Sequence, residues 1–148
     1  MSRRGHLAVI GAGSWGTAFA TVLARNHLPT VLWARRAELA REINSRHRNE
    51  AYLPGIDLPT TLRATSDLDE AAGRASTLIV AVPSHAFREK LKEMGPLIAP
   101  DATVVHLTKG VEPDTLMRMS EVIAEAAGIE PGRTGVVSGP NLAKEVAR

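Results

Sequence analysis

The amino-acid sequence predicts an α/β fold with a doubly wound, mainly parallel sheet. Short apolar, β-branched runs recur along the 148 residues, and stretches of helical periodicity separate them. Each run is apolar at consecutive positions, which is typical of strands that are buried on both faces. Strands and helices that alternate in this way form parallel β–α–β units, and ligands then bind at the carboxyl ends of the strands.

The expected elements alternate in chain order. We expect strands at residues 7–10, 30–33, 62–64, 77–82, 103–107 and 134–138. We expect helices at residues 15–26, 37–47, 85–94 and 114–127, a brief one that ends at residue 72, and a last one from residue 142 onward. Ser66 or Asp67 is the expected cap of the brief helix. The proline- and glycine-containing stretch 48–62 is expected to be an irregular loop.

Composition excludes several classes of function. The chain has no cysteine, which excludes disulfides, thiolate metal sites and cysteine nucleophiles. A net charge of +2 and 3% aromatic residues predict no nucleic-acid partner. No histidine–carboxylate spacing indicates a metal, and no apolar run reaches membrane-spanning length. The apolar run after Arg3 and Arg4 is too short for an export signal, so we expect a cytoplasmic protein.

A glycine-rich turn follows the first expected strand and opens the first helix. It reads Gly11-Ala12-Gly13-Ser14-Trp15-Gly16, the arrangement of a Rossmann dinucleotide-binding domain. The first glycine permits the tight turn, the second lets a pyrophosphate approach the backbone, and the third lets the helix pack on the sheet. The N–H groups of Ser14 and Trp15 are placed to donate to the phosphates. The alternative is a structural turn with no ligand.

The end of the second strand predicts which dinucleotide binds. An NAD-selective site usually has Asp or Glu there, whereas this chain has Arg35 and Arg36. Guanidinium groups pair with a ribose 2′-phosphate and stack on adenine, so we predict that NADPH is preferred over NADH. The alternative is that both arginines are a solvated helix start. The same lack of an acidic residue disfavours a methyltransferase that uses S-adenosylmethionine.

Three further residues are candidates for acid–base or electrostatic work. Lys109 follows a strand at the carboxyl edge, where an ammonium can hold a phosphate and stabilise a developing alkoxide. A solvent-exposed lysine is the alternative. His106 lies within a buried strand and is expected to be a satisfied core histidine. His85 begins a helix beside the expected site, from which it could approach a substrate.

Five segments occur in a fixed order along the chain. They are residues 11–18, the stretch 44–54 that ends in Tyr52-Leu53-Pro54, residues 80–85, Leu107-Thr108-Lys109-Gly110, and Ser138-Gly139-Pro140-Asn141-Leu142-Ala143-Lys144-Glu145. Together they resemble the bacterial NAD(P)-dependent glycerol-3-phosphate dehydrogenases over the whole chain. The resemblance implies reversible hydride transfer between sn-glycerol 3-phosphate and NAD(P), which gives dihydroxyacetone phosphate and serves glycerophospholipid synthesis.

The resemblance also implies site residues. Beside the turn glycines Gly11, Gly13 and Gly16, the cofactor contacts of the family correspond to Ser14, Trp15, Arg35, Arg36, Tyr52, Lys109 and Ala143. The substrate contacts correspond to Lys109, Gly139 and Asn141. Many relatives have Thr or Ser where Asn141 stands.

Family members are longer than this chain and carry a helical second domain that holds the principal catalytic lysine. We therefore expect residues 1–148 to be one dinucleotide-binding domain, an amino-terminal fragment that binds cofactor without full catalysis, with Lys109 in a supporting role. Two alternatives remain, a stand-alone dinucleotide-binding or redox-sensing module and a dehydrogenase of another small hydroxy acid. A homodimer is compatible with the resemblance.

Overall fold

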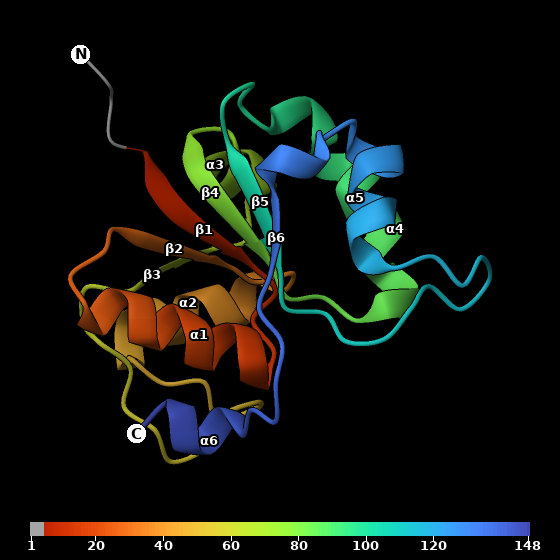
Figure 1. The fold of residues 1–148 in the computed structure, drawn as a ribbon. Helices are drawn as coiled ribbons and strands as arrows, with labels where there is room; N and C mark the ends of the chain where they lie inside the picture. The colour runs from red at the N-terminus through yellow and green to blue at the C-terminus, as the bar shows by residue number, and fades with distance from the viewer. Residues whose placement is uncertain (1–4) are drawn as a thin grey trace.

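A computed structural model describes residues 5–148, so Arg3 and Arg4 lie outside the described residues. Six strands form one parallel sheet with the order β3-β2-β1-β4-β5-β6 (Figure 1). The strands are β1 (His6–Ile10), β2 (Thr30–Trp33), β3 (Arg63–Thr65), β4 (Ala75–Val80), β5 (Thr103–His106) and β6 (Thr134–Val136). The helices are α1 (Ser14–Arg25), α2 (Ala37–Arg46), α3 (Leu68–Ala72), α4 (Ser84–Met94), α5 (Met119–Ala127) and α6 (Ala143–Val146), with short 3₁₀ turns η1 (Gly95–Leu97) and η2 (Pro131–Arg133). The predicted fold class is confirmed.

The direction of winding reverses between β1 and β4. The chain runs outward from β1 through β2 to β3, then returns to place β4 on the other side of β1. Ile10 and Val80 are paired at the carboxyl ends of these two strands. Helices that leave neighbouring strands on opposite faces open a crevice at such a point, which is where ligands bind in doubly wound folds.

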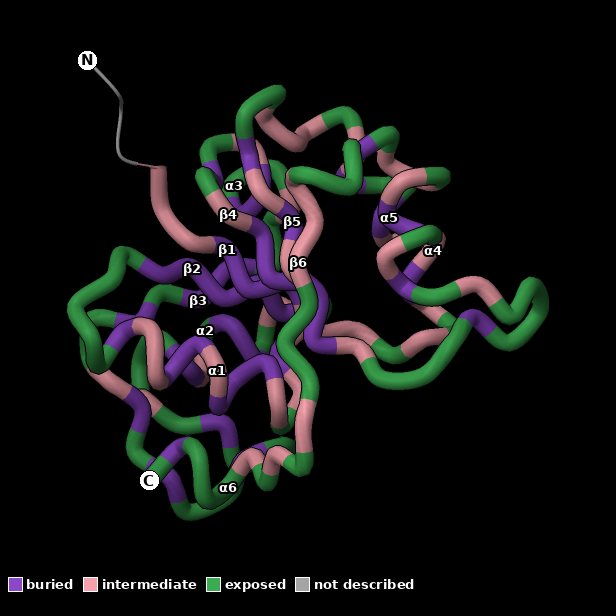
Figure 2. The backbone as a smooth tube through the Cα atoms, in the orientation of Figure 1, coloured by how far each residue is buried: buried purple, intermediate pink, exposed green. Residues whose placement is uncertain are grey.

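Two apolar cores flank the sheet. Val9 of β1 belongs to the core under α1 and α2, whereas its neighbours Ala8 and Ile10 belong to the core under α4 and α5. Successive side chains of a strand point to opposite faces, so the buried residues 8–10 of this one strand supply both cores. Figure 2 shows the buried backbone concentrated in the strands between the two helical layers. This double burial explains the continuous apolar runs of the sequence.

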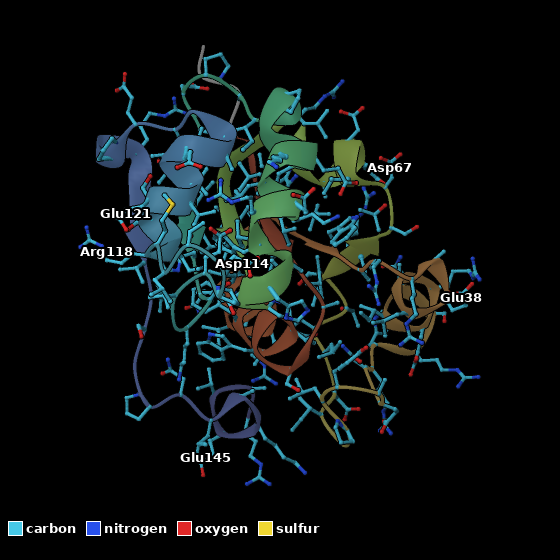
Figure 3. All side chains as sticks on the ribbon, turned by 90° about the vertical axis from the view of Figure 1, so that its right-hand side faces the viewer. Glu38, Asp67, Asp114, Arg118, Glu121 and Glu145 are labelled. Atoms are coloured by element: carbon cyan, nitrogen blue, oxygen red, sulfur yellow. The ribbon has the colours of Figure 1, made fainter. Side chains whose placement is uncertain are left out.

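The expected helix from Asp114 to Ala127 is wrong in its first turn. Helix α5 begins only at Met119, and Leu116 has a left-handed backbone with φ of 61°. The preceding residues form a turn, in which Leu116 N–H donates to the Glu112 carbonyl at 2.8 Å. The Arg118 backbone N–H then donates to the Glu121 carboxylate at 2.8 Å, and these two side chains lie together at the start of α5 (Figure 3). This local cap fixes the helix start.

Several element ends also differ from expectation. Strand β4 lies at Ala75–Val80 rather than 77–82, and β6 ends at Val136 rather than residue 138. At the ends of β4 and β6 the chain leaves the carboxyl edge of the sheet and turns toward the next segment. Asp67, rather than Ser66, caps α3, because its side chain accepts from the backbone N–H groups of Asp69 and Glu70. None of the helices within residues 5–148 is long and apolar enough to cross a membrane.

Candidate functional site

A cleft of about 680 Å³ lies at the carboxyl edge of the sheet, where the winding reverses. The glycine turn after β1 and one face of α4 both line this cleft. The structure brings most of the sequence-predicted cofactor residues together here. The predicted residues that line the cleft are Gly11, Gly13, Ser14, Trp15, Gly16, Arg35, Arg36 and Tyr52.

Two of the three turn glycines are required by the fold itself. Gly11 has φ of 118°, and a Cβ there would lie 2.5 Å from the Ala81 carbonyl oxygen. A Cβ on Gly16 would lie 1.9 Å from the Gly11 carbonyl oxygen, so α1 packs too closely for any side chain. Gly13 differs, because its φ is −73° and no described atom lies within 4 Å of an added Cβ. The space beside Gly13 is therefore open to a ligand that lies in the cleft.

The N-terminus of α1 faces this open space. No side chain within residues 5–148 caps the helix at Gly13, and its first turn holds no acidic residue. The Ser14 hydroxyl is engaged elsewhere, because it donates to the Tyr52 carbonyl at 2.6 Å. The first-turn N–H groups therefore keep their capacity to donate, and the helix dipole adds a partial positive charge. This arrangement suits a phosphate or pyrophosphate group.

The arginine pair lies at the rim of the cleft after β2. Both guanidinium groups are exposed, and neither forms an ion pair with a carboxylate of the described chain. The Arg36 guanidinium carbon lies 6.0 Å from the centroid of the Tyr52 ring, at the far limit of a cation–π contact. Two uncommitted cations beside an aromatic ring can receive an anionic, adenine-containing ligand.

Sequence reasoning missed the wall that α4 contributes. The side chains of His85, Glu89, Lys90 and Glu93 line the cleft, and His85 is thereby placed as expected, beside the site. The Lys90 ammonium lies 4.2 Å from the centroid of the Trp33 ring, over the end of β2. A signal was present, because residues 85, 89 and 93 are four apart and share one helix face.

The predicted substrate residues form a second group outside the cleft lining. The Lys109 ammonium donates to the Gly139 carbonyl oxygen at 2.7 Å, although 30 residues separate them. The Asn141 N–H donates to the same carbonyl at 2.9 Å. Ala143 is partly buried against the core under α1. Thr108, next to Lys109, does line the cleft and donates to the Val82 carbonyl at 2.6 Å, so the two groups are adjacent.

His106 behaves as the expected core histidine. It is 7% exposed, and its Nδ1 donates to the Thr108 carbonyl oxygen at 3.2 Å. Burial lowers the pKa of His106, and the contact with Thr108 offsets this in part. The imidazole is therefore neutral near pH 7 and unsuited to carry charge. Across residues 5–148, no group of three or more His, Asp or Glu side chains is placed to hold a metal ion.

Comparison with known proteins decides the family. Residues 6–148 match the model described as NAD-dependent glycerol-3-phosphate dehydrogenase N-terminus. The chain belongs to this family. It is 54% identical over 140 residues to an NAD(P)+ glycerol-3-phosphate dehydrogenase of Streptomyces avermitilis, which covers 95% of this chain and 42% of the relative. It is 51% identical over 141 residues to such an enzyme of Mycobacterium bovis, with the same two coverages.

Solved structures of the family agree with the fold. The glycerol-3-phosphate dehydrogenase of Coxiella burnetii superposes with a TM-score of 0.87 at 36% identity and covers 97% of this chain and 43% of its own. The enzyme of Saccharomyces cerevisiae gives a TM-score of 0.86 at 29% identity, covering 98% and 44%. The chain thus spans about two fifths of the length of the relatives it matches, and the resemblance seen in the five sequence segments is confirmed.

Proposed function

We propose that this chain is the dinucleotide-binding part of an NAD(P)-dependent glycerol-3-phosphate dehydrogenase. The reaction moves a hydride between C2 of sn-glycerol 3-phosphate and the nicotinamide ring, and the ketone is dihydroxyacetone phosphate. The glycerol 3-phosphate serves glycerophospholipid synthesis. The observation that carries the proposal is the open space at Gly13 beside the uncapped N-terminus of α1. The fold gives Gly13 no steric reason to be glycine, whereas a bound pyrophosphate does.

The residues present fit a dinucleotide. The N–H groups of Ser14 and Trp15 would donate to the pyrophosphate at the helix N-terminus. Arg35 and Arg36 would pair with the 2′-phosphate of NADP, with the Tyr52 ring beside them. When bound, the cofactor supplies the hydride acceptor or donor of the reaction. By the resemblance, Lys109 and Ala143 would lie near its other end.

The substrate side of the proposal rests on Lys109. Its ammonium is exposed and held beside Gly139 and Asn141, so it can bind a phosphate or hydroxyl oxygen and stabilise negative charge at C2. We assign Lys109 a supporting role. Residues 1–148 are assigned to the dinucleotide-binding domain. By the family resemblance, the principal proton-transferring lysine belongs to the helical second domain instead.

Cofactor binding is measured by calorimetry with NADPH and NADH. We expect NADPH to bind roughly 10-fold more tightly, a difference of about 1.4 kcal/mol, because only its 2′-phosphate can pair with guanidinium groups. Arg35→Asp should remove that preference. Arg41→Asp makes the same charge change on the exposed face of α2, where Arg41 pairs with Glu38, and should leave the preference intact. Equal affinities in the unaltered chain would contradict NADP selectivity, and binding of neither would contradict the dinucleotide site.

Turnover is measured with dihydroxyacetone phosphate and NADPH in a steady-state assay. We expect cofactor binding without appreciable turnover, because the principal base is assigned elsewhere. Appreciable turnover by the purified chain would overturn that assignment. A cytoplasmic location and a homodimer complete the proposal, and sedimentation of the purified chain measures its oligomeric state.

A further inference from the structure

Asn49 is a wholly buried polar residue between the glycine turn and the loop that carries Tyr52. Its Nδ2 donates to the Ala12 carbonyl oxygen at 3.0 Å and to the Thr17 hydroxyl oxygen at 2.8 Å. Its Oδ1 accepts from the Tyr52 N–H at 3.2 Å. Both amide hydrogens and the amide oxygen are therefore engaged at a position with 0% exposure. Burying an amide costs free energy that an apolar side chain would avoid, so its contacts need an explanation.

The contact with Ala12 fixes the orientation of one peptide group in the turn. In a trans peptide the carbonyl and the following N–H point in opposite directions. Because Asn49 holds the Ala12 carbonyl toward the protein interior, the Gly13 N–H points away from Asn49. That N–H has no hydrogen-bond partner among residues 5–148, and Gly13 lines the cleft. A flipped peptide would instead present a carbonyl oxygen, which repels phosphate.

The same side chain ties the Tyr52 loop to the turn. The Tyr52 N–H donates to Asn49, and the Tyr52 carbonyl accepts from the Ser14 hydroxyl at 2.6 Å. Both backbone polar groups of Tyr52 are thus held, one by a buried amide and one by a turn residue. The loop cannot leave the rim of the cleft without breaking a contact that also orients the turn.

We propose that Asn49 is a positioning residue for the phosphate-binding turn. Its carboxamide holds the Ala12–Gly13 peptide so that the Gly13 N–H faces the pyrophosphate, and it joins the Tyr52 loop to that arrangement. The proposal rests on the proposed function, because it assumes a pyrophosphate in the cleft. Asn49 acts through Gly13 and does not itself line the cleft.

The test compares a ligand that has a pyrophosphate with one that lacks it. Asn49→Asp preserves the volume and the acceptor for Tyr52, but sets a carboxylate oxygen against the Ala12 carbonyl. We expect this variant to bind NADPH at least about tenfold more weakly, because the Gly13 N–H would lose its charge-assisted hydrogen bond to the pyrophosphate. Adenosine 2′-monophosphate would bind at the arginines and the Tyr52 ring, and the Tyr52 N–H keeps its acceptor in this variant, so its affinity should change by less than about threefold.

A matched control is available at Asn44. Its amide also makes two bridging contacts, to the Ala64 carbonyl and N–H at 2.8 Å each, but it joins α2 to β3 away from the turn. Asn44→Asp should therefore lower the melting temperature without separating the two ligands. Asn49→Ala serves as the second variant, with circular dichroism to show that each protein is folded.

A ligand-free measurement keeps the two proposals distinguishable. Amide NMR of the apo chain should show the Gly13 and Tyr52 resonances shifted in Asn49→Asp and unchanged in Asn44→Asp. If Asn49→Asp weakened the binding of NADPH and adenosine 2′-monophosphate equally, or left NADPH binding unchanged, the role of Asn49 would be overturned while the dinucleotide site stands. Failure of the unaltered chain to bind NADPH and NADH would overturn the proposed function instead.

Discussion

The proposed cofactor side and the proposed substrate side of this protein are built in different ways. Around the glycine turn, close backbone packing at Gly11 and Gly16 and the buried amide of Asn49 fix the geometry from within the described chain. In the segment 107–148, Lys109 is exposed and has one carbonyl partner. Large apolar side chains are also exposed there, with Leu116 at 72% and Leu142 at 61%. Substitutions at Gly11 or Gly16 should therefore disturb folding, whereas substitution of Lys109 should disturb substrate binding with little effect on folding.

The largest effect is expected at Gly16. A Cβ there would overlap the Gly11 carbonyl, so Gly16→Ala must push α1 away from β1. Overpacking of this kind costs about 3 kcal/mol or more, which lowers the melting temperature by roughly 10 °C. Gly13→Ala is the matched control, because it meets no described atom. It should melt within about 2 °C of the unaltered chain but bind NADPH more weakly. Equal melting temperatures for the two variants would contradict the distinction between the turn glycines.

Glu112 provides an intermediate effect, because it fastens the substrate-side loop to α4. Its carboxylate receives two hydrogen bonds from Arg88, at 2.7 and 2.8 Å, and another from Thr115. The bonds from Arg88 and then Thr115 lower the pKa of Glu112 to about 2. Glu112→Gln should lower the melting temperature by several degrees at pH 7, whereas Glu125→Gln, which alters an exposed partner of the same arginine, should change it little.

The pH dependence of that effect follows from the lowered pKa. The carboxylate contributes stability above its unfolded pKa of 4.5, and the contribution is lost as the pH falls from 4.5 toward 2. The difference in melting temperature between the unaltered chain and Glu112→Gln should therefore shrink as the pH falls from about 4.5 to about 3, an interval that lies within this window. A difference that stays constant over this interval would show that the ion pair is not its source.

The smallest effect on stability is expected at Lys109. Its ammonium makes an exposed contact, so Lys109→Met should change the melting temperature by less than about 1 °C. The stabilisation that dihydroxyacetone phosphate gives to the NADPH-bound chain should nevertheless disappear. Lys144→Met, a change at another exposed lysine, should preserve it. If the melting temperature of Lys109→Met fell by several degrees, the proposed substrate side would be as tightly fixed as the cofactor side.

The sequence by itself determined the fold class, the glycine turn and the position of the arginine pair. These follow from local patterns: apolar runs, helical periodicity, and glycines at set distances along a few residues. The helix expected from Asp114 failed because a tertiary contact prevailed over local propensity. Glu112 accepts hydrogen bonds from Arg88 of α4 and from Thr115, and the chain around Leu116 takes a left-handed turn.

Only the tertiary structure decided which side chains act on the turn and the cleft. Asn49 reaches Ala12 across 37 positions, and Lys109 reaches Gly139 across 30. The ammonium of Lys90 in α4 lies over the ring of Trp33 at the end of β2, 57 positions earlier in the chain. Such contacts leave no periodic or adjacent signature, because the distance along the chain carries no information about which residues the sheet brings together. The glycine turn is a motif that the sequence alone predicts, whereas the Asn49 amide contacts the turn only in the folded chain.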